Sequence, residues 1–147
     1  MVSKQQAGEL IRDARFRSGR SWAEIAEAID RPVVWTVAAL LGQHPMTASD
    51  AAKVGELLEL DDEVVRVLQM QPYRGSGNQE VPTDPTIYRL HEAMDVYGPA
   101  IKELIHEEFG DGIMSAINFK VDVARREDPT GDRVVITLDG KFLDYEW

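Results

Sequence analysis

Two short stretches of the sequence carry side chains whose types and spacing could do chemistry. In IYRLHEAMDVYG, residues 87–98, Arg89 and Glu92 are three positions apart, which would place both side chains on one face of a helix. An arginine oriented by a carboxylate can bind an anion through its planar guanidinium, but such a pair is also common as a simple surface ion pair. The spacing alone is compatible with both interpretations.

The second stretch is FGDGIMSAINFKVDV, residues 109–123, where two glycines precede Ser115 in an otherwise apolar run. The hydroxyl of Ser115 could fill space in a core, cap a helix or donate a hydrogen bond in a site. A nucleophilic role is not indicated, because no histidine or lysine is placed by motif to deprotonate it. Backbone N–H groups near the start of IMSAINF, where we expect a helix to begin, would favour an anion.

The remaining residue types argue against metal and thiol chemistry. His44, His91 and His106 show no metal-ligand spacing with acidic residues, and the chain has no cysteine. A cysteine-free chain fits the cytoplasm, and neither a signal-peptide pattern nor an apolar run of about 20 residues is visible. We therefore expect a cytoplasmic protein without a metal and without a membrane partner.

The first half of the chain predicts a bundle of helices. Apolar residues recur at helical spacing up to about residue 74 and indicate five short helices. Ser21 with Glu24 three residues later is a capping-box pattern at one helix start. Further helix starts are predicted at Pro32, at Thr47 or Ser49, and at Asp61 or Asp62.

The segment PYRGSGNQEVPTDP, residues 72–85, has the composition of a linker. We assign residues 1–75 to an N-terminal bundle, 76–84 to the linker and 85–147 to a C-terminal domain. In the C-terminal domain we expect two helices, separated at Gly98–Pro99, and two or three short strands with a hairpin turn at Asp139–Gly140. So small a sheet is marginal alone, and we expect a partner subunit to complete it. The fold class is α+β, mainly helical.

The segment SWAEIAEAIDRPVVWTVAALLG, residues 21–42, resembles the helix-turn-helix of repressor-type domains. This resemblance gives the alternative function, which is a DNA-binding regulator with a C-terminal oligomerisation domain. The helix after the turn, however, has no Arg, Lys, Asn or Gln before Gly42 to contact bases or phosphates. The net charge of −10 also argues against nucleic acid as a partner, though not against a small anion.

Three motifs together resemble the cyanase (cyanate hydratase) family. They are PTIYRLHE, then FGDGIMSAINFKVDV, then VVITLDGKFL, in the order in which the family has them. The segments AALLGQ, VLQM and the YRG before the linker also fit. The resemblance covers nearly the whole chain and is strongest after Pro82.

The resemblance implies an enzyme that converts cyanate and the co-substrate bicarbonate to carbamate and carbon dioxide, with carbamate then decaying to ammonia and carbon dioxide. It implies no metal and no organic cofactor. The positions that match the family's catalytic residues are Arg89, Glu92 and Ser115. The substrate-binding residues that we assign are Arg89, Ile113, Ser115, Ala116 and Leu143. The resemblance also implies a homodecamer of five dimers, with an intertwined C-terminal dimer and active sites between subunits.

These residue types suit the implied reaction, because cyanate and bicarbonate are both monoanions that repel each other. A desolvated guanidinium would lower that repulsion and orient both anions. We expect Arg89 to bind them and Glu92 to orient Arg89, since a bare carboxylate would itself repel the substrates. Ser115 is expected to donate a hydrogen bond.

Overall fold

The computed structural model describes residues 1–72 and 81–146. Its contacts divide the chain into two compact units, Met1–Gly75 with Val121–Val135, and Ser76–Lys120 with Ile136–Trp147. The described residues form six helices and one two-stranded sheet, which confirms the mainly helical α+β class. The domain boundaries assigned from sequence stay a prediction, and most of the assigned linker lies outside the described residues.

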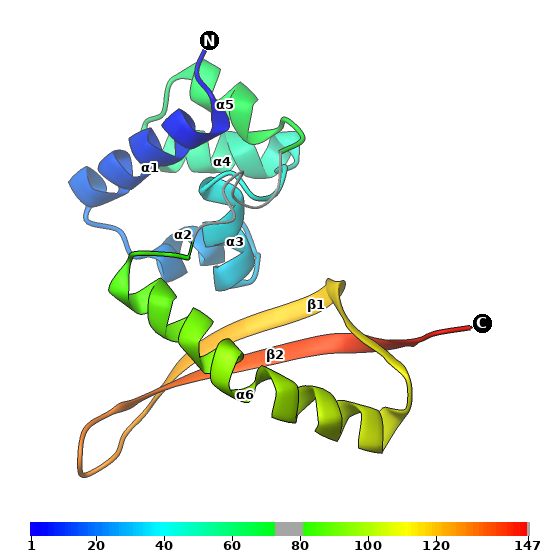
Figure 1. The fold of residues 1–147 in the computed structure, drawn as a ribbon. Helices are drawn as coiled ribbons and strands as arrows, with labels where there is room; N and C mark the ends of the chain where they lie inside the picture. The colour runs from blue at the N-terminus through cyan, green and yellow to red at the C-terminus, as the bar shows by residue number, and fades with distance from the viewer. Residues whose placement is uncertain (73–80, 147) are drawn as a thin grey trace. The chain divides into compact units, whose positions relative to one another are not determined.

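The first 68 residues form the expected five helices, which are α1 Lys4–Ser18, α2 Trp22–Ala28, α3 Val33–Leu40, α4 Ala48–Leu58 and α5 Asp62–Leu68 (Figure 1). The predicted capping box is present. The Ser21 hydroxyl accepts the Glu24 N–H at 3.1 Å, and the Glu24 carboxylate accepts the Ser21 N–H at 2.6 Å. Thr47 and Asp61 are the N-cap residues of α4 and α5, so these local signals are confirmed.

The helices of the bundle enclose a continuous apolar core. All five contribute a buried side chain to it, and the largest apolar ones that are fully buried are Ile11, Ile25, Leu40, Val54 and Leu68. Removal of this apolar surface from water is the main force that holds short helices together, because none of them is long enough to be stable alone.

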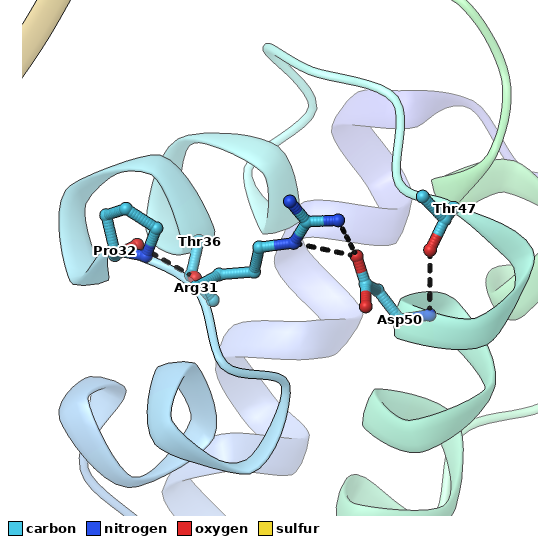
Figure 2. Close-up of polar contacts among 5 residues, drawn as sticks. All are labelled: Arg31, Pro32, Thr36, Thr47 and Asp50. Atoms are coloured by element: carbon cyan, nitrogen blue, oxygen red, sulfur yellow. Dashed lines mark hydrogen bonds and ion pairs between the residues drawn. The ribbon is translucent and has the colours of Figure 1, made fainter.

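A partly buried ion pair joins the turn between α2 and α3 to the start of α4 (Figure 2). Arg31 donates from Nε and Nη2 to one carboxylate oxygen of Asp50, at 3.1 and 2.9 Å. The Asp50 side chain is 8% exposed and that of Arg31 is 42% exposed. Thr47 caps α4 by accepting the Asp50 N–H at 3.1 Å. Because Arg31 is engaged in this way and α3 is apolar, the alternative of a DNA-reading helix-turn-helix is not favoured.

The second unit begins with one long helix, α6 Pro85–Phe109, and not with the two helices that we expected. That prediction is wrong because Gly98–Pro99, although typical of a helix break, lies inside the helix, which continues through Pro99. Proline removes one backbone hydrogen bond, and its ring crowds the carbonyl one turn earlier. That carbonyl belongs to Asp95, which is exposed, so water can bind it in place of the missing N–H.

Two long strands follow, β1 Gly112–Arg126 and β2 Arg133–Asp144, paired in one sheet (Figure 1). The predicted helix start in IMSAINF was therefore wrong, and so was the turn at Asp139–Gly140, which lies inside β2. The chain reverses between Arg126 and Arg133 instead. There the Asp128 carboxylate accepts the Thr130 N–H and hydroxyl at 3.0 and 2.7 Å, and Gly131 has φ of 130°. Asp128, Pro129 and Gly131 in this segment are a stronger turn signal than Asp139–Gly140.

The helix and hairpin bury very little within one chain. No residue of α6 is buried, none of β2 is, and β1 buries only Gly112 and Ser115. None of the helices in residues 1–72 and 81–146 is long and apolar enough to cross a membrane.

Candidate functional site

Arg89 and Glu92 lie in the second turn of α6, and the start of that helix is well defined. The Asp84 carboxylate accepts the N–H groups of Thr86 and Ile87 at 2.9 and 3.0 Å, and Pro85 occupies the first helical position. This capping fixes where the helix begins. It thereby fixes which face of α6 carries the pair.

The predicted proximity of Arg89 and Glu92 is confirmed. Arg89 Nε lies 3.8 Å from Glu92 Oε2, and the two side chains are 68% and 54% exposed. The guanidinium carbon also lies 5.2 Å from the ring centroid of Tyr88. At this separation the carboxylate attracts the guanidinium without a direct hydrogen bond, so the N–H donors of Arg89 remain available to an anion.

Ser115 is the buried polar side chain of β1, with only 5% of the residue exposed. Its Oγ accepts the backbone N–H groups of Ile117 and Asn118, each at 3.0 Å. A serine hydroxyl has two lone pairs and one proton. Because both lone pairs are occupied by these N–H groups, the proton remains as the part of the hydroxyl that can reach a further group. The arrangement is that of a hydrogen-bond donor.

The other predicted binding residues lie near the same end of the hairpin. Ile113 and Ala116 flank Ser115 closely in β1, and the N–H of Tyr145, two residues after Leu143, donates to the Asp111 carbonyl at 3.2 Å. Ile113 and Leu143 are 47% and 43% exposed. The structure therefore brings these residues to one end of the sheet, and their role in binding substrate stays a prediction.

One chain does not bring Arg89 to Ser115. Arg89 lies near the N-terminal end of α6, about 30 Å along the helix axis from Phe109, and Ser115 follows the C-terminal end. Within the described residues no hydrogen bond or ion pair joins them. Arg89 pairs with Glu92, and Ser115 with backbone N–H groups of its own strand.

An apolar hollow of about 380 Å³ lies beside Met114, between the end of α6 and the hairpin. Ile105 and Phe109 of α6 and Leu138 and Phe142 of β2 contribute to its walls, and the rings of Phe109 and Phe142 stack with centroids 5.0 Å apart. Gly140, which also lines the hollow, was missed by the sequence reasoning. A glycine inside an alternating strand is a signal of close backbone approach, and that signal was available.

The three histidines do not gather into a metal site. In the part of the chain that the structure describes, no three His, Asp or Glu side chains lie close enough together to hold an ion. His91 Nδ1 lies 3.3 Å from Asp95 Oδ2, one turn further along α6.

Both parts of the chain match models of one family of enzymes. Residues 4–72 match the model described as cyanate hydratase, N-terminal, and residues 79–147 match the cyanate lyase C-terminal domain. The chain belongs to the cyanate hydratase family.

Individual relatives agree over nearly the full length. Cyanate hydratase of Mycolicibacterium vanbaalenii is 60% identical over 146 residues, covering 99% of this chain and 95% of that protein. Cyanate hydratase of Thiobacillus denitrificans is 53% identical over 144 residues, covering 98% of each. The crystal structure of cyanase from T. urticae superposes with a TM-score of 0.82 at 37% identity, covering 93% of this chain and 96% of that one.

Proposed function

We propose that this chain catalyses the bicarbonate-dependent decomposition of cyanate. Carbamate has one more oxygen than cyanate, and carbon dioxide has one fewer than bicarbonate, so the first step must pass an oxygen from bicarbonate to the cyanate carbon. That step consumes one proton. Decay of carbamate consumes two more and gives ammonium and a second carbon dioxide.

The observation that carries this proposal is the pairing of Arg89 with Glu92 on α6, at 3.8 Å. Two monoanions must approach each other, and the guanidinium offers a positive charge with several N–H donors in one plane. Glu92 would hold that plane in orientation. We assign Glu92 no direct contact with substrate, because its negative charge would repel both anions.

Ser115 would supply the second fixed group of the site. Its hydroxyl is oriented by the N–H groups of Ile117 and Asn118, so its proton can be donated to an oxygen or nitrogen on which negative charge develops. A donor that needs no reorganisation is worth more to the reaction than a freely rotating hydroxyl. Ile113, Ala116 and Leu143 would form the walls that limit the site to small anions.

We further propose that the complete site forms between subunits of a homo-oligomer, a decamer of five dimers. The separation of Arg89 and Ser115 along one chain supports this, because a second chain can supply the missing group. The apolar side chains exposed on α6 and the hairpin support it as well, since burial against other subunits would remove them from water.

Neither a metal nor an organic cofactor is part of the proposal, because Arg89 can supply the positive charge that the two anions need. The cytoplasm is the compartment that we propose, since a chain without cysteine gains nothing from an oxidising environment. Full activity after prolonged dialysis against a chelator is the expected result, and a loss that added metal restores would contradict the cofactor-free reaction.

The decisive experiment measures ammonia release from cyanate in degassed buffer, with and without added bicarbonate. Ammonia should appear only when both anions are present, with two carbon dioxide molecules for each ammonium. Equal rates without bicarbonate would contradict the two-substrate reaction. No cyanate consumption under either condition would contradict the function itself.

A further inference from the structure

β2 passes β1 at Gly140 without room for a side chain. A Cβ at position 140 would lie 2.5 Å from the carbonyl oxygen of Ser115, would press on Cγ of Met114 and would lie 3.1 Å from Met114 Sδ. Distances under 3.0 Å are shorter than Cβ atoms tolerate. A side chain there would therefore force the Ser115 backbone or the strand to move.

The need for glycine at this position is a matter of space and not of backbone dihedrals. The glycines with positive φ among the described residues are Gly19, Gly42, Gly110 and Gly131, so Gly140 has an ordinary conformation for a strand. Gly112 makes a similar close approach from the other strand. A Cβ there would press on the Leu143 carbonyl oxygen and lie 2.9 Å from the Asp144 Cα. The two strands thus leave no room for a side chain at Gly140, opposite Ser115, and at Gly112, three residues before it.

The orientation of the Ser115 hydroxyl depends on this backbone. Its Oγ accepts N–H groups two and three residues ahead, each at 3.0 Å, which requires a particular path of the chain from Ser115 to Asn118. The Ser115 carbonyl belongs to the first peptide plane of that path. A displacement of the carbonyl would turn the plane, move the two N–H groups and release the hydroxyl to rotate.

We propose that Gly140 is a positioning residue for Ser115. By carrying no side chain, it lets β2 hold the Ser115 backbone in the path on which the N–H groups of Ile117 and Asn118 both reach the hydroxyl oxygen and leave its proton free to be donated. The inference rests on the proposed function for the use of that proton in catalysis, but the geometry itself can be tested separately.

The test compares Gly140→Ala with Gly98→Ala, in which a Cβ meets no atom within 4 Å. Amide hydrogen exchange, measured on the assembled protein, should show faster exchange at Ile117 and Asn118 in Gly140→Ala and unchanged exchange in Gly98→Ala. The kcat for cyanate should fall by about 100-fold in Gly140→Ala, with a smaller change in KM, because misplacement by about 1 Å is enough for such a loss. Unchanged exchange at both amides would overturn the proposal.

A double variant distinguishes positioning from general damage. If Gly140 acts through the Ser115 hydroxyl, Gly140→Ala combined with Ser115→Ala should be no slower than Ser115→Ala alone. If the losses of kcat in the two single variants multiply in the double variant, the proposal is overturned.

Failure of the proposed function would give a different result. The wild-type protein would then not consume cyanate, but amide exchange at Ile117 and Asn118 would still show whether Gly140 positions Ser115. Faster exchange with full kcat would leave the function standing and remove the positioning role.

A further variant covers the case in which Gly140→Ala does not fold. Adding Met114→Ala removes the contacts to Cγ and Sδ and leaves the Ser115 carbonyl as the short contact. This variant should assemble, as Met114→Ala alone should, and should keep the loss of kcat. Recovery to the rate of Met114→Ala alone would mean that the contact with the Met114 side chain is what matters, and would overturn the proposal.

Discussion

Ser115 has an oxygen whose two lone pairs are both engaged, and this decides what it can do in a reaction. A nucleophilic serine needs a base to take its proton and a lone pair free to attack. Here the lone pairs accept backbone N–H groups, and within the described residues no base is bonded to the hydroxyl. The side chain is suited to donate its proton to a bound anion and unsuited to form a covalent intermediate.

Ser115→Ala should lose about 2–4 kcal/mol of transition-state stabilisation, the usual cost of removing one preorganised donor. The measurement is kcat/KM for cyanate at saturating bicarbonate. The variant should also lose about 1–2 kcal/mol of stability, because the N–H groups of Ile117 and Asn118 lose their acceptor. A wild-type rate would show that the hydroxyl only fills space.

Arg89→Lys should lose most of the activity while the assembly survives. Lysine keeps the positive charge but lacks the planar set of N–H donors that Glu92 orients. Steady-state rates and the mass of the oligomer are the measurements. Arg125→Lys is a matched control, because Arg125 forms an exposed pair of similar length with Asp132, at 3.7 Å, on the hairpin. Equal activity in the two variants would mean that Arg89 supplies only diffuse charge.

The elements of the bundle depend on the ion pair between Arg31 and Asp50, which joins the α2–α3 turn to α4. Arg31→Ala should lower the free energy of unfolding by about 1–2 kcal/mol. The substitution leaves the Asp50 carboxylate, which is only 8% exposed, without its partner. The expected loss is smaller than for a fully buried pair, because Arg31 is 42% exposed and solvent screens its interaction with Asp50. Urea denaturation gives the measurement, with the exposed Arg12→Ala as control. No difference between the two variants would show that water replaces Arg31 at Asp50 without cost.

Element boundaries were predictable where one side chain bonds to the backbone nearby. Ser21 and Asp84 mark helix starts by chemistry that reaches only two or three residues, so the sequence displays it directly. Glycine and proline were harder to interpret, because each has more than one use. Gly98–Pro99 does not break α6, and Gly140 does not turn the chain.

The candidate site also has parts that depend on nearby residues in the sequence and parts that depend on distant ones. The pair Arg89–Glu92 follows from helical spacing and could be predicted. The hydrogen bonds at Ser115 depend on the path of a strand that was expected to be a helix. The glycine inside an alternating strand signals a close approach at Gly140, but the partner of that approach, Ser115, is far away in the sequence and no local pattern identifies it.

At the scale of the whole molecule, the two units differ in how much apolar surface they leave in water. Side chains as large as Tyr97, Leu104 and Ile117 are 64%, 64% and 98% exposed. Isolated exposed apolar residues are common, but so many on one helix and hairpin mark an interaction surface. A second copy of the chain is the partner that we propose for it.

A site shared between subunits predicts complementation. Arg89→Ala and Ser115→Ala, each strongly impaired alone, should recover partial activity when they are unfolded together and reassembled. Random mixing creates some sites with an intact arginine from one chain and an intact serine from another. The measurement is cyanate-dependent ammonia release by mixed oligomers whose composition is verified by mass.

Each variant refolded by itself is the control, and its activity should stay at its own low level. Activity of the wild-type protein should also fall when the oligomer is dissociated by dilution or mild denaturant. Inactive mixed oligomers of verified composition, or full specific activity in an isolated monomer, would contradict the shared site.

The core of the bundle is complete within the first 68 residues, and this has a consequence for the chain during its synthesis. The bundle can fold on the ribosome while the rest of the chain is still being made, because every contact in its core is local to that segment. The long helix and the hairpin have no such opportunity. In the proposed oligomer, their apolar side chains would stay exposed to chaperones and proteases until another finished chain arrives, and the rate of production would then set how long each chain is at risk.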